Sequence, residues 1–288
     1  MFIELNNISK AFRPPVGPVR HALEHVTLSI DPGEFVSIVG FTGCGKSTLL
    51  KIACGLLVPD TGEVRVDNQR LEGVPKEAAI VFQNYSLLPW FSALENVRLA
   101  VGAAFPTWTR DRQRAQASRY LELVGLGSAL NRRPSQLSGG MRQRVSIARA
   151  FATEPTLLFL DEPFGALDAL TRGALQIELA QLCSMAGRPV TTLMITNNLD
   201  EALLLSDRIV PMSRGPRARL LDSIVVNLPR PRTAARLVHD DDAVRLRGRV
   251  AEALIGMGKT EAARSMEHTT VARVPIGSAT PVAGAGQP

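Results

Sequence analysis

A glycine-rich segment, Gly40-Phe-Thr-Gly-Cys-Gly-Lys-Ser-Thr48, has the residue types and spacing of a phosphate-binding loop. Its glycines let the backbone curl so that N–H groups face an anion, while Lys46 can reach the terminal phosphates of a nucleotide and the Ser47 hydroxyl can ligate Mg²⁺. The apolar run Phe35–Val39 before it predicts a buried parallel strand. Apolar pairs after it, as far as Leu56-Leu57, predict a helix. This strand–loop–helix order predicts binding of a nucleoside triphosphate.

Two carboxylates, Asp161 and Glu162, follow a second apolar run, Leu157–Leu160. A carboxylate at the carboxyl end of a buried strand can hold Mg²⁺, directly or through water, which is the role expected for Asp161. Glu162 is then placed to polarise the water molecule that attacks the γ-phosphate. The alternative, a strand that simply ends in a charged turn, is disfavoured by the phosphate-binding loop upstream.

The segment Leu137-Ser-Gly-Gly-Met-Arg-Gln-Arg144 lies between these two motifs and opens a helix predicted from Met141 to about Phe151. The small residues Ser138, Gly139 and Gly140 leave backbone N–H groups uncovered at a helix start, where the helix dipole adds positive charge. This predicts a second anion site, to which Ser138 adds a hydroxyl donor or a helix cap. The alternative is a polar loop whose only role is to cap the helix.

The order of these motifs resembles that of the nucleotide-binding subunits of ATP-binding cassette (ABC) transporters, over roughly residues 2–225. The resemblance implies an α/β fold, the P-loop NTPase ABC ATPase fold, with a parallel sheet core, an antiparallel β subdomain and a helical subdomain. It also implies ATP and Mg²⁺ as cofactors. The sequences of residues 85–90, 161–172 and 200–210 resemble those of the nitrate/sulfonate/taurine importers. Residues 94–101 and 213–216 are more similar to the nitrate, cyanate and bicarbonate branch.

The resemblance assigns roles to individual residues. Gln83 senses Mg²⁺ and the attacking water, Asp168 lies across a dimer interface, and Phe12 holds the position of an aromatic residue that stacks on adenine, most often a Tyr in the family. The expected catalytic residues are Glu162, Gln83 and Asn197, and the expected metal ligands are Ser47, Gln83 and Asp161. The expected nucleotide-binding residues are Gly40, Phe41, Thr42, Gly43, Cys44, Gly45, Lys46, Ser47, Thr48, Phe12, Ser138, Gly139 and Gly140.

Asn197 departs from the family pattern, in which this switch position is usually a histidine between Thr and Asp. An asparagine amide can still donate a hydrogen bond to the γ-phosphate, but it cannot become cationic or relay a proton. We therefore hypothesise that hydrolysis at this chain's own site is slow. The alternative is a benign substitution at a tolerant position.

The segment Tyr85–Phe91 after Gln83 is unusually apolar for a loop. If Leu88, Trp90 and Phe91 are exposed, they form a pocket for a helix of another protein, because aromatic anchors dominate such interfaces. By resemblance this is where an integral membrane permease docks. The alternative is internal packing. Further implied partners are a second ABC ATPase subunit, identical or different, and indirectly a periplasmic or lipid-anchored solute-binding protein.

Composition fits a subunit that meets a membrane through a partner. The 288 residues are 45% hydrophobic, enough for a sizeable core. No run approaches the ~18–20 apolar residues that span a bilayer, and no N-terminal signal is visible, so we expect a peripheral protein on the cytoplasmic face of the bacterial inner membrane. The net charge is +6, but the basic residues are scattered, and no nucleic-acid partner is expected. Three cysteines without paired spacing predict free thiols.

The chain divides into three predicted parts. Residues 2–228 form the ABC ATP-binding domain, with its helical subdomain at about 93–150. Residues 229–266 form a C-terminal helical extension, and residues 267–288, rich in Ala, Gly, Pro, Val and Thr, form a disordered tail.

The expected function is that of the ATP-binding and hydrolysing subunit of an ABC importer, which energises uptake of a small anion (nitrate, sulfonate or taurine, cyanate or bicarbonate) through a separate permease. The main alternative is a degenerate cassette that binds ATP with little turnover and acts in a heterodimer or in regulation. A cassette of DNA repair or translation would carry a coiled-coil insertion or two fused cassettes, and a kinase or GTPase has no use for LSGGMRQR.

Overall fold

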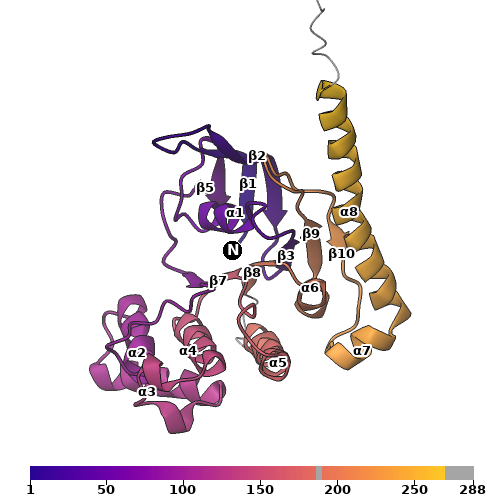
Figure 1. Cartoon of the computed structure of the whole chain (residues 1–288). Helices are drawn as coiled ribbons and strands as arrows, with labels where there is room; N and C mark the ends of the chain where they lie inside the picture. The colour runs from indigo at the N-terminus through magenta and orange to yellow at the C-terminus, as the bar shows by residue number, and fades with distance from the viewer. Residues whose placement is uncertain (186–189, 270–288) are drawn as a thin grey trace, which may run out of the picture.

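Two β-sheets of different kinds lie at the centre of the chain (Figure 1). The computed structural model describes residues 1–185 and 190–269, with the side chains of residues 184–185 and 257–269 excepted. The predicted tail lies, from residue 270 on, outside the described residues.

The larger sheet has six strands in the order β10-β9-β3-β8-β7-β6, and all neighbours are parallel except β10 and β9. Every residue of β3, β7 and β8 is buried, which explains why β3 and β7 are mainly apolar rather than alternating; β8 carries buried threonines at both ends. The strands are β3 (Phe35–Val39), β6 (Ala78–Val81), β7 (Leu157–Asp161), β8 (Thr191–Thr196), β9 (Arg208–Pro211) and β10 (Ile224–Val225).

The smaller sheet is antiparallel, in the order β2-β1-β4-β5. Its strands are β1 (Ile3–Phe12), β2 (Arg20–Ile30), β4 (Thr61–Val66) and β5 (Gln69–Arg70). One face alternates into a core that it shares with α1 (Lys46–Ala53) and with one face of the parallel sheet. The predicted α/β fold with a parallel core and an antiparallel β part is confirmed.

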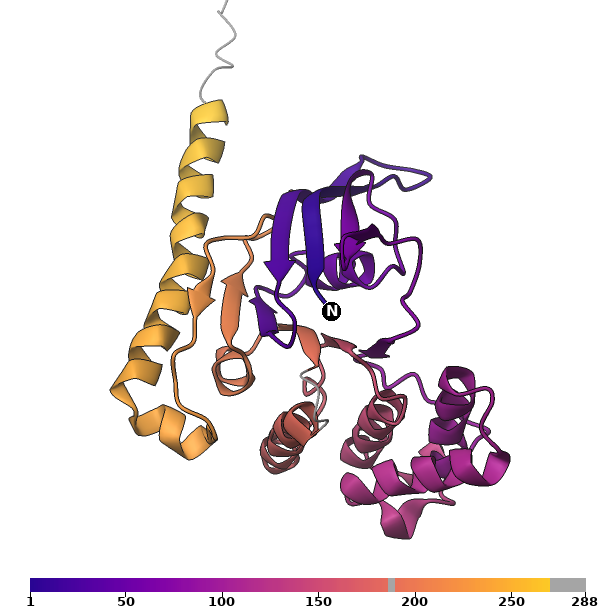
Figure 2. The same ribbon diagram turned by 180° about the vertical axis from the view of Figure 1, so that it is seen from behind.

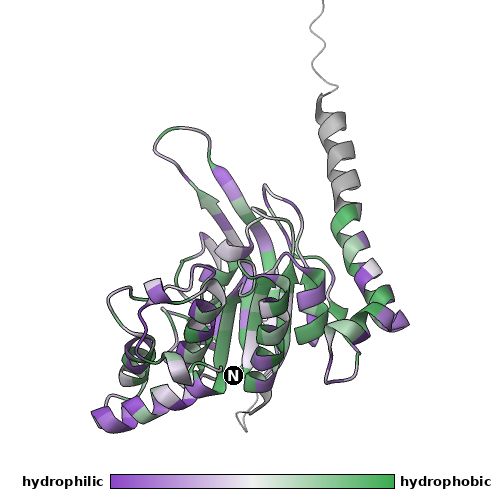
Figure 3. Cartoon of the chain, turned by 60° about the horizontal axis from the view of Figure 1, so that its bottom comes forward, coloured by the Kyte–Doolittle hydropathy of each residue, from purple (hydrophilic) through white to green (hydrophobic). Residues whose placement is uncertain are grey.

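Helices cover the other face of the parallel sheet (Figures 1 and 2). Three of these helices begin at a capping residue: the side chains of Ser92, Thr109 and Ser138 each accept a hydrogen bond from a backbone N–H in the first turn of the helix that follows. Figure 3 shows green apolar strands at the centre, between helices of mixed hydropathy. The helices are α2 (Ala93–Ala104), α3 (Arg110–Leu123), α4 (Gly139–Phe151), α5 (Ala169–Met185) and α6 (Leu199–Leu205), with 3₁₀ turns η1 (Gly127–Ala129) and η2 (Pro134–Gln136).

Two predicted helix boundaries were wrong. Helix α1 ends at Ala53, short of Leu57, because Gly55 adopts φ +79° and packs so closely on Gly73 that a Cβ there would lie 2.2 Å from the Gly73 carbonyl oxygen. Helix α4 begins at Gly139 rather than Met141, because the Ser138 side chain caps it.

The C-terminal segment forms α7 (Ala234–His239) and α8 (Asp241–Thr269). Helix α8 has 29 residues and runs along the edge of the molecule beside β10 and past it (Figures 1 and 2). Within residues 1–185 and 190–269, no helix has the length and apolar character needed to span a membrane.

Candidate nucleotide site

Three of the predicted site segments lie at one edge of the parallel sheet because β8 lies between β3 and β7. Parallel strands end at the same edge, and ligands of such sheets bind outside the carboxyl ends of their strands. The loop Gly40–Gly45 follows β3, Asp161 ends β7 with Glu162 directly after it, and Asn197 follows β8. The strand order thus assembles three segments that are far apart in the sequence.

Lys46 is buried at the start of α1 and its Nζ donates to the carbonyl oxygens of Gly40 and Phe41 at 2.9 and 3.0 Å. The same Nζ lies 3.8 Å from Glu162 Oε1. The ammonium is thus held at the mouth of the loop, next to a carboxylate of β7, where it can neutralise phosphate charge.

Ser47 and Asp161 lie side by side, with Ser47 Oγ donating to Asp161 Oδ1 at 3.1 Å. Burial raises the pKa of Asp161, and the Ser47 hydrogen bond opposes that rise. A hydroxyl and a carboxylate are the hard oxygen ligands that Mg²⁺ prefers, and a cation there would offset the burial of the carboxylate. The two residues therefore fit the predicted metal role.

Glu162 has a backbone φ of +44°, a left-handed conformation that is rare for a side chain of this size. The backbone is held there because Glu162 N–H donates to Ile195 O at 3.0 Å across the neighbouring strand. Its side chain accepts from Gln83 Nε2 at 3.2 Å. Such local strain clusters at functional sites, and here it directs the carboxylate toward Lys46 and Gln83.

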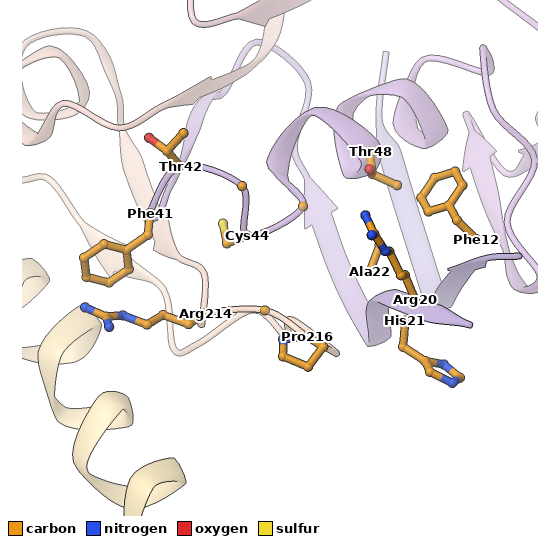
Figure 4. Close-up of a pocket in the computed structure, with 13 residues that line it drawn as sticks. Phe12, Arg20, His21, Ala22, Phe41, Thr42, Cys44, Thr48, Arg214 and Pro216 are labelled. Atoms are coloured by element: carbon orange, nitrogen blue, oxygen red, sulfur yellow. The ribbon is translucent and has the colours of Figure 1, made fainter. Parts of the chain in front are cut away.

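A pocket of about 630 Å³ lies beside the glycine-rich loop (Figure 4). Phe12 lines one end with Thr48, and Phe41 lies at the other end against Arg214, whose guanidinium carbon is 4.0 Å from the ring centroid. Phe12 is 43% exposed, so its ring is available for stacking. The lining residues that sequence reasoning missed are Arg20, His21, Ala22, Arg214, Gly215 and Pro216.

Cys44 is buried in the loop, and burial raises the pKa of its thiol. A protonated, covered thiol is a poor nucleophile, so Cys44 has the character of a packing residue.

The signature residues Ser138, Gly139 and Gly140 lie away from this pocket, whose lining in the described part of the chain comes only from segments before residue 49 and from 214–216. Gly140 packs directly on α5, since a Cβ added there would lie 2.4 Å from Thr171 Cγ2. Asp168, at the start of α5, accepts from Thr171 N at 3.0 Å. The structure thus joins the signature helix to the Asp168 turn and keeps both apart from the chain's own phosphate loop.

Arg149, near the end of the signature helix, was not predicted as a site residue. Its guanidinium donates to the carbonyl oxygens of Tyr85 and Ser86 at 2.8 and 2.6 Å. Both residues have positive φ, 63° and 46°. Burial lowers the pKa of Arg149. The bonds tie the segment after Gln83 to α4, a contact that no local sequence pattern could have indicated.

The predicted apolar surface after Gln83 is smaller than expected. Trp90 is 61% exposed, whereas Leu88 and Phe91 are half-buried. The reason is the buried Asn96, whose amide bonds the backbone of Leu88 and Phe91 and folds the segment back on α2. Trp90 is therefore the most exposed large apolar side chain of this loop.

Asn197 is exposed between two anchored residues at the end of β8. Thr196 Oγ1 accepts from Asn198 N at 3.0 Å and donates to Glu201 Oε2 at 2.6 Å. Asn198 Oδ1 caps α6 by accepting from Asp200 N at 2.9 Å. The position of Asn197 is thus set by its neighbours and by the first turn of α6.

Known proteins share this architecture and these motifs. A family model for the ABC transporter domain matches residues 23–165. The nitrate import ATP-binding protein NrtD of Synechococcus elongatus is 47% identical over 246 residues, which cover 85% of this chain and 89% of that protein. The chain belongs to the ABC transporter family.

Two further similarities place the chain within this family. The bicarbonate transport ATP-binding protein CmpC of the same organism is 43% identical over 273 residues, which cover 95% of this chain but only 41% of CmpC, so the chain spans about two-fifths of that relative. A dimeric post-hydrolysis structure of the ATP-binding cassette MJ0796 bound to ADP and Pi has a TM-score of 0.68 at 30% identity, covering 79% of this chain and all of the cassette. The resemblance inferred from the ABC motifs is confirmed, including its nitrate and bicarbonate branch.

Proposed function

We propose that the chain is the ATP-binding and ATP-hydrolysing subunit of an ABC importer for a small anion, nitrate or bicarbonate being the candidates that the relatives' names favour. The observation that carries the proposal is the continuous set of contacts from Gln83 through Glu162 to Lys46, beside the Ser47–Asp161 pair. These are the groups that phosphoryl transfer to water requires.

ATP would bind with its phosphates in the curl of residues 40–48 and its base on Phe12. The backbone N–H groups of the loop and the start of α1 supply donors, and Lys46 supplies charge at the terminal phosphates. In accepting ATP, Lys46 would exchange its bonds to Gly40 and Phe41 for phosphate oxygens.

Hydrolysis would use Glu162 as the group that orients the attacking water and accepts its proton. Gln83, already hydrogen-bonded to Glu162, would hold the same water from the other side. Ser47 and Asp161 would hold Mg²⁺, which when bound neutralises charge on the β- and γ-phosphates. Asn197 would donate one amide hydrogen bond to the γ-phosphate.

A second cassette would complete the site. The signature residues of this chain lie outside its own pocket, and the N-terminus of α4 carries the uncovered donors of an anion site. We propose that Ser138, Gly139 and Gly140 contact ATP bound by the partner cassette, with Asp168 at the interface between the two.

The membrane partner would be a permease that docks on Tyr85–Phe91, with Trp90 as the anchor. Arg149 joins this segment to the signature helix, and Gln83 joins it to the catalytic carboxylate. A movement of Glu162 or Gln83 on ATP binding would therefore be transmitted to Tyr85–Phe91 through these hydrogen bonds and the short chain segment between them. This arrangement would place the chain at the cytoplasmic face of the inner membrane, with a solute-binding protein acting on the other side.

The test is uptake by the reconstituted complex of this chain with its permease and binding protein in vesicles. ATP inside the vesicles should drive uptake of labelled nitrate or bicarbonate, and Glu162→Gln should abolish it. Trp90→Ala should uncouple uptake from hydrolysis, while Val58→Ala, at another exposed apolar position, should not. Uptake that proceeds equally with Glu162→Gln would refute the proposal.

One alternative function rests on Asn197. A cassette whose switch residue cannot carry a proton could bind ATP, turn it over slowly and depend on a partner with an intact histidine. The two proposals differ only in the rate at this chain's own site.

A further inference from the structure

Two arginines of the C-terminal segment bond the carboxyl end of α6. Arg232 Nη1 donates to the carbonyl oxygens of Leu203 and Ser206 at 2.9 and 2.5 Å, and Arg230 Nη2 donates to Leu205 O at 2.8 Å. These oxygens are among the last carbonyls of the helix, which have no partner inside it. The free carbonyl groups at the end of α6 are thus hydrogen-bonded by side chains of the segment between β10 and α7.

Arg232 is the central group of this contact. It also donates to Val226 O at 3.0 Å and Leu228 O at 3.1 Å, so one guanidinium joins the end of α6 to the segment that follows β10. Burial lowers the pKa of Arg232 to about 10, which leaves it charged near neutral pH. A planar cation with five donors suits this set of carbonyls as no other side chain does.

A third arginine bonds the opposite end of α6. Arg247 of α8 donates through Nε to Asp200 Oδ1 at 2.8 Å, and Asp200 lies in the first turn of α6. Helices α6, α7 and α8 lie side by side in both ribbon views (Figures 1 and 2). The pair is partly exposed, at 32% for Arg247 and 63% for Asp200, so it can be altered without opening the core.

Helix α6 has seven residues, too few to be stable in isolation. Its first turn holds the switch segment, because Asn198 caps it and Thr196 bonds Glu201. A shift of α6 along or about its axis would therefore move Asn197. In the described part of the chain neither Asn197 nor any residue of α6 lines the pocket beside the phosphate loop, so α6 acts on the switch through backbone position.

We infer that Arg230, Arg232 and Arg247, here called the arginine clamp, are positioning residues for the switch residue Asn197. The C-terminal segment thereby sets the rate of the hydrolytic step without touching ATP. The effect on the rate of hydrolysis rests on the proposed function. The effect on the position of Asn197 rests only on the contacts of α6.

The experiment compares Arg247→Asp, Asp200→Arg and the double exchange D200R/R247D in the full chain assembled with its permease. Arg245→Asp is the matched control, since Arg245 lies on the same helix and forms its ion pair with Asp242 of α8 rather than with α6. ATP turnover gives kcat and KM. Amide hydrogen exchange of residues 197–205, measured on the isolated full chain, reports the order of α6 whether or not ATP is hydrolysed.

Arg247→Asp and Asp200→Arg should each lower kcat about fivefold and leave KM for ATP unchanged. Each should also speed amide hydrogen exchange in residues 197–205 by a similar factor. The double exchange should restore both, and Arg245→Asp should match the wild type. Unchanged exchange in Arg247→Asp, or losses that the double exchange does not restore, would overturn the inference. Changed exchange without any ATP turnover in the wild type would support the clamp and refute the proposed ATPase instead.

Discussion

At the scale of single residues, Asn197 distinguishes this chain from the family pattern. Its exposed amide stands between Thr196 and Asn198, both fixed by hydrogen bonds, so the backbone is ready to present whatever side chain occupies the position. Whether this position can carry charge or a proton therefore depends on its side chain, while its placement depends on α6.

We expect Asn197→His to raise kcat of the assembled complex about tenfold, because an imidazole can carry charge and a proton where an amide cannot. Steady-state phosphate release measures this. Asn197→Ala is the control and should turn over more slowly than the wild type, since it removes the amide donor. A histidine variant no faster than the wild type would contradict the hypothesis of a slow site.

Glu201 predicts a pH dependence of stability. Burial raises its pKa above the ordinary value of 4.5, against the opposing hydrogen bond from Thr196 and the nearby Arg172. The folded chain therefore binds more protons than the unfolded one between the ordinary and the raised pKa. This contribution to stability is fully present below the ordinary pKa and is lost as pH rises through the raised one.

The difference in unfolding free energy between the wild type and Glu201→Gln isolates this effect, because the glutamine cannot titrate. Urea unfolding at several pH values from about 4.5 to about 7 should show the wild type losing stability relative to the variant as pH rises. A difference that is constant, or that grows with pH, would contradict the assignment. Glu24 and Asp60, whose pKa values are lowered, act below this range and cancel in the comparison.

At the scale of elements, the strand–loop–helix unit and the carboxylates of β7 could be predicted because their signals are local. Phe35–Val39 is apolar except for Ser37, the glycines follow it directly, and Asp161 ends a similar apolar run. The side chains Arg20, His21 and Arg214 meet Phe12 and Phe41 only through the fold. Arg149 and Arg232 bond distant backbone carbonyls, which leave no trace in sequence.

Gly140 is the element-scale test of the signature helix. Gly140→Ala should lower the free energy of unfolding by about 1–3 kcal/mol, because its Cβ would overlap Thr171 Cγ2. Gly139→Ala should be neutral or slightly stabilising, since its Cβ would lie 3.5 Å from the Tyr85 hydroxyl and alanine favours helix. Thermal and urea unfolding measure both.

Thr171→Ser removes the Cγ2 methyl group and supplies the control. Combined with Gly140→Ala, it should recover most of the lost stability. If Gly140→Ala is as stable as the wild type, or if Thr171→Ser brings no recovery, α4 and α5 do not pack as the structure has them.

At the scale of the whole molecule, the signature residues lie apart from the pocket of the phosphate loop, and we propose that they serve a nucleotide bound by a partner cassette. The phosphate loop, Asp161 and Glu162 form one edge of the parallel sheet, and the signature helix presents its donors elsewhere. The C-terminal segment adds a third part, which bonds both ends of α6. In the proposed account, ATP binding, contact with the partner cassette and positioning of Asn197 therefore involve separate parts of the chain.

Single-turnover phosphate release by the purified full chain, in excess over ATP, tests the central claim that this chain hydrolyses ATP with Glu162. We predict release by the wild type, and release about a hundredfold slower by Glu162→Gln with ATP affinity unchanged. Lys46→Ala should lose ATP binding itself. Release by Glu162→Gln at the wild-type rate, or no release by the wild type despite bound ATP, would contradict the account.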